Sequence, residues 1–271
     1  MKSVWPLLIS ACLLLAGCAA QQAQLQVADQ PTPVEDNTRQ VLSFDSGLFG
    51  EQPEIIPVEE VFRLSDEQQK AFFKHFESPI RQFTPPHERV YDYLQDITMD
   101  FGYQGETFTA QEALQNGSGN CLSLAILTTA LAKLAGVETD YQLVDSAPVF
   151  ESHGNIVYKG QHVRTKLYSP ADVTTGSFLL RSSGLLIDYF PTEGTRFVSN
   201  ISETQYIAMF YNNLASEAIA REDYNAAFWL LQKTLELTPE DPGVINSMAV
   251  IHRRIGDLDK AEEIYQYGIA H

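Results

Sequence analysis

Apolar residues recur at helical spacing from about Leu64 onward, where we expect ordered structure to begin. The residues Ser65–Gln68 have the form of a capping box and predict the start of a helix, which Pro79 ends. A second helix is predicted from about Pro86 and stops at Gly102. The two apolar faces consist of Ala71, Phe72, Phe73 and Phe76 in the first helix and of Val90, Leu94, Ile97 and Phe101 in the second.

A further capping box at Thr109–Glu112 predicts a short helix that Gly117 closes. The next residues, Gly117–Asn120, predict a flexible turn whose last residue is a helix N-cap. The helix that follows is broadly apolar until Gly136, so we expect it to be largely buried. Cys121 therefore lies in the first turn of a buried helix.

Strand-like runs replace the helical spacing in the middle of the chain. The predicted strands are Val137–Val144, His162–Tyr168, Phe178–Arg181 and Leu185–Phe190. The last two flank a turn at Ser182–Gly184. Helices followed by antiparallel strands indicate an α+β domain.

From Tyr211 onward the pattern is helical and repeats every 34 residues, as Ala227 and Ala261 illustrate. The matching positions are Tyr211, Leu214, Ala215, Tyr224, Ala227 and Leu231 with Ile245, Met248, Ala249, Leu258, Ala261 and Tyr265. This pattern resembles two tetratricopeptide repeats over about 211–271, although it lacks the Trp and the first Gly of that family. Because three repeats are usually needed for stability, we expect these two to pack against the α+β domain or against a helix near 202–220.

The N-terminus has the features of a secretion signal, with Lys2 ahead of the apolar run Val4–Leu15. The sequence Leu-Ala-Gly-Cys that ends at Cys18 resembles the lipobox of bacterial lipoproteins. That resemblance implies cleavage before Cys18, lipidation of its thiol, and an anchor on the periplasmic face of the outer membrane, since Ala19 and not Asp follows. The alternative is an ordinary signal peptide with a chance cysteine.

The net charge of −17 makes nucleic acid and anionic lipid poor partners on electrostatic grounds. Of the three cysteines, Cys12 leaves with the signal and Cys18 takes the lipid, so Cys121 stands alone in an oxidising compartment. Such a thiol is either buried and inert or kept for its reactivity. The sequence contains no Cys/His cluster with metal-ligand spacing, so we expect no metal, and nothing in it implies a cofactor.

A helix N-terminus favours the thiolate form of Cys121, and a nucleophilic thiol also needs a histidine that is oriented by a carboxylate. His162 opens one predicted strand, and Asp188 lies in a later apolar strand. A cysteine on a helix, then a histidine and an aspartate on strands, resembles the transglutaminase-like branch of the papain-type cysteine enzymes over about 101–192. The resemblance implies Cys121 as nucleophile, His162 as base and acid, and Asp188 as orienter. The chain lacks the aromatic residue directly after His162 and the Trp near the cysteine that well-known members have.

Other assignments remain open at this stage. His153 is a rival base in a loop-like setting, and Asp172 is a rival orienter that also suits a turn. The other histidines, which carry no pattern, are His75, His87, His252 and His271.

We expect four parts: a signal peptide (1–17), a tether (18–60) with some ordered segments near Phe44–Phe49, a transglutaminase-like domain (61–198) and a helical repeat region (199–271). The expected activity is that of a membrane-anchored cysteine peptidase or amidase, which acts on a peptide or protein substrate through a thioester at Cys121. One alternative is a non-catalytic envelope adaptor that binds protein partners through its repeats. The other is an enzyme that transfers the acyl group to an amine.

Overall fold

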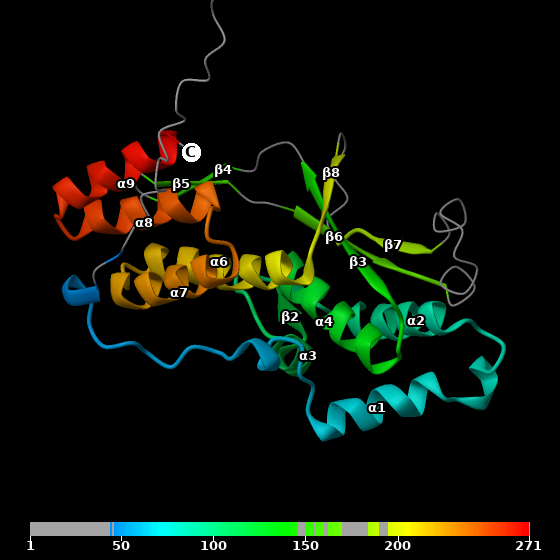
Figure 1. The fold of residues 1–271 in the computed structure, drawn as a ribbon. Coiled ribbons are helices and arrows are strands. Elements are labelled where there is room, and N and C mark those ends of the chain that lie inside the picture. Colours follow the sequence, from blue (N-terminus) through cyan, green and yellow to red (C-terminus); the bar gives the residue numbers. More distant parts are fainter. Residues whose placement is uncertain are drawn as a thin grey trace, which may run out of the picture. The chain divides into compact units, whose positions relative to one another are not determined.

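The computed structural model describes residues 44, 46–145, 150–153, 156–159, 162–169, 184–189 and 195–270, which fold into helices and antiparallel strands (Figure 1). The α-helices are α1 (Asp66–Phe76), α2 (Pro86–Thr98), α3 (Ala110–Asn116), α4 (Cys121–Leu134), α6 (Glu203–Ala220), α7 (Tyr224–Leu237), α8 (Pro242–Arg254) and α9 (Leu258–Ala270). The short 3-10 helices are η1 (Ser46–Leu48), η2 (Val58–Glu60) and η3 (Pro79–Arg81). The strands are β1 (Gly102–Tyr103), β2 (Ser118–Gly119), β3 (Thr139–Asp145), β4 (Phe150–His153), β5 (Ile156–Lys159), β6 (His162–Leu167), β7 (Leu185–Ile187) and β8 (Arg196–Ile201). The mixed helical and antiparallel architecture confirms the α+β prediction.

Side-chain caps set the beginnings of the helices as the sequence predicts. Ser65 caps α1 and Thr109 caps α3, each in a complete capping box. Gly117 ends α3 in the left-handed conformation (φ +57°), which a residue with a Cβ adopts only with strain.

Two local predictions are wrong. The second helix ends at Thr98 and not at Gly102, which instead opens β1. The expected flexible turn before Cys121 contains β2, which pairs with β1 in parallel. Two-residue strands carry no periodicity, so the Gly and Ser content of this segment favoured a turn.

A four-stranded sheet in the order β7-β6-β3-β8 packs against α4. Its neighbouring strands are all antiparallel. The core between sheet and helix includes residues with almost no exposed surface, among them Ile126, Leu127, Leu131 and Leu167. Since α4 is buried along nearly its whole length, its first residue has a fixed position relative to the sheet.

The predicted strands 137–144, 162–168 and 185–190 correspond to β3, β6 and the shorter β7. The β4–β5 hairpin and β8 were not predicted. The expected strand at 178–181 lies outside the described residues.

The C-terminal part consists of two helix pairs, α6–α7 and α8–α9, whose members pack against one another. The small residues of the 34-residue pattern lie at these contacts and are buried; they are Ala215, Ala227, Ala249 and Ala261. Helix α6 also belongs to the core of the α+β part, where the Tyr206 ring stacks on Tyr141 of β3 at 4.3 Å between centroids. Because α6 shares this core, two helix pairs can stay ordered although three repeats are usually needed for stability.

Residues 46–60, here called the N-terminal strap, lie against the helix pairs. Phe49 is buried and stacks on Phe228 of α7 at 4.1 Å between ring centroids. Trp229 Nε1 donates to the carbonyl of Gly50 at 3.1 Å, and Asn225 Nδ2 donates to that of Glu51 at 3.1 Å. Ordered structure therefore begins before Leu64 and extends beyond the segments expected near Phe44–Phe49.

The strap continues toward the α+β part of the fold. The Tyr211 hydroxyl of α6 donates to the carbonyl of Ile56 at 2.7 Å, and Val61 is fully buried in the core beside the sheet.

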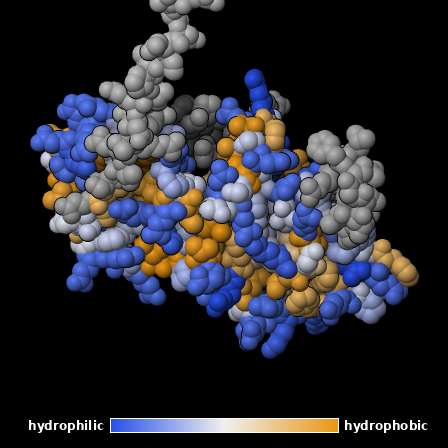
Figure 2. Space-filling model, viewed as in Figure 1, coloured by the Kyte–Doolittle hydropathy of each residue, from blue (hydrophilic) through white to orange (hydrophobic). Residues whose placement is uncertain are grey.

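Figure 2 shows hydrophobic surface over α6 and α7 and at β8, where Phe197 and Val198 are more than half exposed. Within the described part of the chain, no helix is both long and apolar enough to span a membrane.

Candidate active site

Cys121 is the first residue of α4, and Asn120 holds the start of that helix. The Asn120 side-chain oxygen accepts from the backbone N–H of Ser123 at 2.9 Å, as an N-cap does. Its amide nitrogen donates to Thr107 Oγ1 at 2.7 Å. One side chain therefore caps the cysteine helix and ties it to the loop before α3.

Gly119 is required by the close packing in front of the cysteine. Its φ is +149°, and a Cβ there would lie 2.7 Å from Ser123 Cβ. The Ser123 hydroxyl also accepts from the backbone N–H of Phe108 at 2.8 Å. A side chain at position 119 would displace this hydroxyl and shift the first turn of α4.

Replacing Asn120 by Ala is expected to lower the free energy of unfolding by about 1–2 kcal/mol, because both the helix cap and the bond to Thr107 are lost. Urea unfolding of the full chain measures the change. Asn116, an exposed residue at the end of α3, offers a matched control, and Asn116→Ala is expected to change stability by less than about 0.5 kcal/mol. Equal losses in the two variants would show that the Asn120 cap contributes nothing specific.

His162 and Asp188 are in direct contact, as the sequence suggests. His162 begins β6, and its Nε2 lies 2.7 Å from Asp188 Oδ1. Both side chains are largely buried, with 8% and 17% exposed. Because the carboxylate accepts a hydrogen bond from Nε2–H, the other ring nitrogen, Nδ1, is the one left to act as a base.

Arg164 is a third member of this cluster that the sequence analysis missed. Its Nε donates to Asp188 Oδ2 at 2.6 Å, and its side chain is 18% exposed. His162 and Arg164 are alternate residues of one strand, so they lie on the same side of the sheet. The alternation of His162 and Arg164 in the sequence could have predicted that Arg164 lies on the same side of the sheet as His162.

The surroundings of Cys121 favour its protonated thiol over the thiolate. Burial raises the pKa of Cys121, and the charge of Asp188 raises it further, while the backbone N–H groups of Leu122 and Cys121 lower it. The helix N-terminus thus lowers the pKa of Cys121, as the sequence predicts, but burial raises this pKa by more. A thiolate formed in advance, as the helix position alone suggests, is not the resting state.

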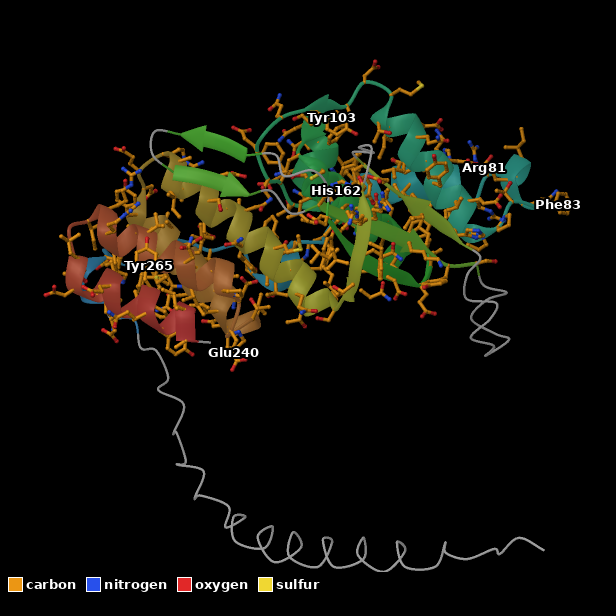
Figure 3. The ribbon with its side chains drawn as sticks, turned by 90° about the horizontal axis from the view of Figure 1, so that it is seen from above. Arg81, Phe83, Tyr103, His162, Glu240 and Tyr265 are labelled. Atoms are coloured by element: carbon orange, nitrogen blue, oxygen red, sulfur yellow. The ribbon has the colours of Figure 1, made fainter. Side chains whose placement is uncertain are left out.

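Cys121 is electrostatically coupled to Asp188, but no hydrogen bond joins its sulfur to His162 among the bonds of the described residues. Tyr103 on β1 is a further neighbour. Burial raises its pKa, and the charge of a Cys121 thiolate adds to the effect. The Tyr103 hydroxyl donates to the backbone carbonyl of Tyr189, the residue after Asp188, at 3.3 Å. Figure 3 labels Tyr103 and His162 near the middle of the view.

The rate of Cys121 alkylation by iodoacetamide is expected to keep rising as pH increases through 9, because only the thiolate reacts and burial raises the thiol pKa. Mass spectrometry of the peptide that contains Cys121 measures this rate separately from Cys12 and Cys18. The same peptide, alkylated after unfolding in urea, should follow an ordinary thiol pKa of about 8.5. A folded-state rate that is already at its plateau near pH 7 would contradict the protonated resting state.

The helix pairs contribute one residue to the loop that holds the cysteine helix. Glu217 of α6 accepts from the backbone N–H of Thr107 at 2.8 Å. Burial raises the pKa of Glu217, and its hydrogen bonds to Thr107 partly offset the rise. The Thr107 hydroxyl also accepts a hydrogen bond from Asn120, the cap of α4. Thr107 therefore connects Glu217 of α6 to the start of the cysteine helix.

The remaining candidates fall into two groups. The side chains of His153 and Asp172, and the positions of Cys18 and His271, lie outside what the structure describes. His252 has a carboxylate partner, with Nδ1 2.9 Å from Asp257 Oδ2, but it is buried on α8 against Phe49. Cys121 is the free cysteine of the described chain, and these same residues include no cluster of three or more metal-ligating side chains.

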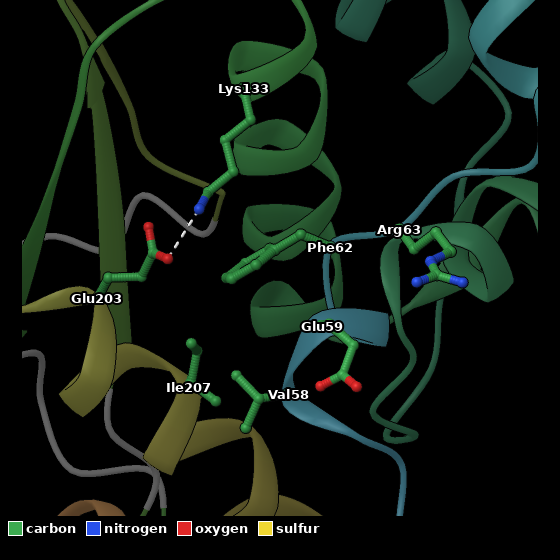
Figure 4. A pocket seen from close by; sticks show the side chains of 7 residues that line it. All are labelled: Val58, Glu59, Phe62, Arg63, Lys133, Glu203 and Ile207. Carbon is green, nitrogen blue, oxygen red and sulfur yellow. Dashed lines mark hydrogen bonds and ion pairs between the residues drawn. The ribbon is translucent and has the colours of Figure 1, made fainter.

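A separate pocket of about 340 Å³ lies at the other end of α4 (Figure 4). Lys133 and Glu203 on its wall form an ion pair at 2.7 Å, and the Lys133 ammonium lies over the Phe62 ring. Lys133 is three helical turns from Cys121, about 18 Å along the axis, so this pocket does not contain the Cys–His–Asp site.

The chain was compared with protein families, curated proteins and solved structures. No family model matches the chain, and no curated protein matches it. A putative cysteine protease from Cytophaga hutchinsonii is similar in structure, with a TM-score of 0.34 and 15% sequence identity. The similarity covers 53% of this chain and 46% of the other, so the chain matches less than half the length of that protein.

Proposed function

We propose that the chain is a cysteine hydrolase of the transglutaminase-like class, with Cys121 as nucleophile, His162 as base and acid, and Asp188 as orienter. The observation that carries the proposal is the buried 2.7 Å contact between His162 Nε2 and Asp188 Oδ1, in electrostatic range of a cysteine at a helix N-terminus. The substrate is an amide or peptide bond.

The proposed reaction uses these three side chains in the roles just assigned. His162 Nδ1 takes the proton of the Cys121 thiol as the sulfur attacks the carbonyl carbon, and the backbone N–H groups of Cys121 and Leu122 stabilise the oxyanion. The C–N bond breaks as the imidazolium gives its proton to the leaving amine, which leaves a thioester. Water then attacks the thioester with His162 again as base, and releases the acid and the thiol. General-base catalysis of this kind suits a thiol that is protonated at rest.

Hydrolysis of p-nitrophenyl acetate by the full chain tests this proposal, because the small ester can acylate a partly buried thiol without a recognition sequence. We expect turnover that is lost in Cys121→Ala and in His162→Ala. Profiling with a mixed peptide library, with Cys121→Ala as control, then identifies the scissile bonds. Incorporation of a labelled amine in place of hydrolysis would identify the transfer reaction. Equal rates for the parent chain and Cys121→Ala would exclude the hydrolase.

One observation favours a second candidate, the non-catalytic adaptor. The Cys121 thiol has a raised pKa, and no hydrogen bond to His162 is present in the described structure. In that case the helix pairs α6–α7 and α8–α9, interpreted as two tetratricopeptide repeats, would bind envelope proteins. The ester assay separates the two candidates, because an adaptor shows no Cys121-dependent turnover.

The cellular setting is part of the proposal. The lipobox-like sequence that ends at Cys18 supports a lipid anchor in the bacterial envelope, with the folded part in the periplasm. The full chain should partition into the membrane fraction and incorporate a labelled fatty acid, and Cys18→Ser should incorporate none. Equal labelling of the parent chain and Cys18→Ser would refute a lipid at Cys18.

A further inference from the structure

Asp188 contacts two nitrogen-bearing side chains, one at each carboxylate oxygen. His162 Nε2 contacts Oδ1 at 2.7 Å, and Arg164 Nε contacts Oδ2 at 2.6 Å. All three side chains are less than one-fifth exposed. With one oxygen bound to the guanidinium, the carboxylate cannot rotate, so the other oxygen stays directed at the imidazole.

The backbone explains why Arg164 reaches this position. Thr165 pairs with Ile187 across the β6–β7 ladder, so extending the register by one residue puts Arg164 opposite Asp188. The guanidinium is planar and always charged, which gives its Nε–H a fixed direction. Burial of an arginine is costly unless a carboxylate pairs with it, and here that carboxylate is the one that orients the candidate base.

We propose that Arg164 is a positioning residue of the active site, an inference that rests on the proposed hydrolase function. It acts through Asp188 in two ways. It fixes Oδ1 toward His162 Nε2, which leaves Nδ1 free for the thiol proton. It also places a positive charge on the far oxygen of Asp188, and repulsion between that charge and a second positive charge on the ring favours the neutral imidazole, which can accept that proton.

The other titratable groups near His162 lie on β6 and on the elements packed against it. They are Cys121 on α4, Asp188 and Tyr189 after β7, Asp140 and Asp145 on β3, Lys166 on β6 and Tyr103 on β1. Arg164 Nε contacts Asp188 Oδ2 at 2.6 Å, so its removal alters the orienting carboxylate directly. The Lys166 ammonium lies over the Tyr168 ring.

The pH–rate profile of p-nitrophenyl acetate hydrolysis tests the inference in the full chain. In Arg164→Gln a hydrogen-bond donor remains but the charge is lost. We expect the pH of half-maximal rate on the acid side to rise by about one unit. Arg164→Lys restores the charge and should return the half-maximal pH to within about 0.3 units of the parent value, with a lower plateau because the planar fork is missing. The control is Lys166→Met, on the same strand and the same side of the sheet. It should leave the half-maximal pH and the plateau rate nearly unchanged.

The outcomes separate this inference from the proposed function. If His162→Ala is inactive while Arg164→Gln keeps the parent profile, the role of Arg164 is refuted and the hydrolase stands. If Arg164→Gln and Arg164→Lys lose rate equally with no change in half-maximal pH, Arg164 is only structural and the inference again fails. If His162→Ala keeps the parent rate, the proposed function fails and the inference falls with it. Far-ultraviolet circular dichroism of each variant checks that it is folded.

Discussion

Asp188→Asn is expected to lower the rate of ester hydrolysis by about a thousand-fold, although the change replaces one oxygen by an NH₂ group of the same size. Arg164 Nε will keep the remaining oxygen as its acceptor, so the new amide nitrogen faces His162 Nε2. An amide N–H donates, and it therefore selects the tautomer in which Nε2 accepts and Nδ1 carries the proton. That is the nitrogen that must accept the proton of the thiol.

The control for this substitution is Asp140→Asn on β3. Asp140 accepts from the Tyr168 hydroxyl at 2.5 Å and has no described contact with His162. Asp140→Asn removes the same charge from the same sheet and should hydrolyse the ester within a few-fold of the parent rate. Similar rates in Asp188→Asn and Asp140→Asn would rule out Asp188 as the orienter of the base.

Phe49→Ala is expected to lower the free energy of unfolding by about 3 kcal/mol or more, because a buried aromatic ring is replaced by a cavity. The ring is 7% exposed, stacks on Phe228, and meets the His252 ring edge-on at 5.2 Å between centroids. Urea unfolding of the full chain gives the size of the effect. Fluorescence of Trp229, in a Trp5→Phe background, reports whether the strap has left α7, since Trp229 donates to Gly50.

Phe83 offers the matched control, because it is 90% exposed. Phe83→Ala should change the free energy of unfolding by less than about 0.5 kcal/mol. If Phe49→Ala is no more destabilising than Phe83→Ala, the strap contributes nothing to the stability of the helix pairs.

Local signals in the sequence predicted several elements of the fold. Capping boxes located the starts of α1 and α3, and Asn120 located the start of α4. These predictions succeeded because a cap satisfies backbone N–H groups within three or four residues, so the sequence alone contains both partners. The proximity of His162 and Asp188 was suggested by resemblance, and the structure contains their contact.

Features that depend on distant pairing were missed. The strap looked like a tether because its Pro and acidic residues have no periodicity, while its partners are nearly two hundred residues away in α7. Arg164 became recognisable only when the β6–β7 register put it opposite Asp188. The protonated state of Cys121 depends on burial by residues from several elements, and a helix position does not reveal that burial.

The strap also determines where mechanical load enters the fold. A pull on the chain ahead of Phe49 acts, among the described contacts, first on the ring stack with Phe228 and on the Trp229 bond. Both partners belong to α7, and along the chain they precede Val61 and the core beside α4. Tension from the N-terminal side therefore reaches the helix pairs before it reaches the core that positions Cys121.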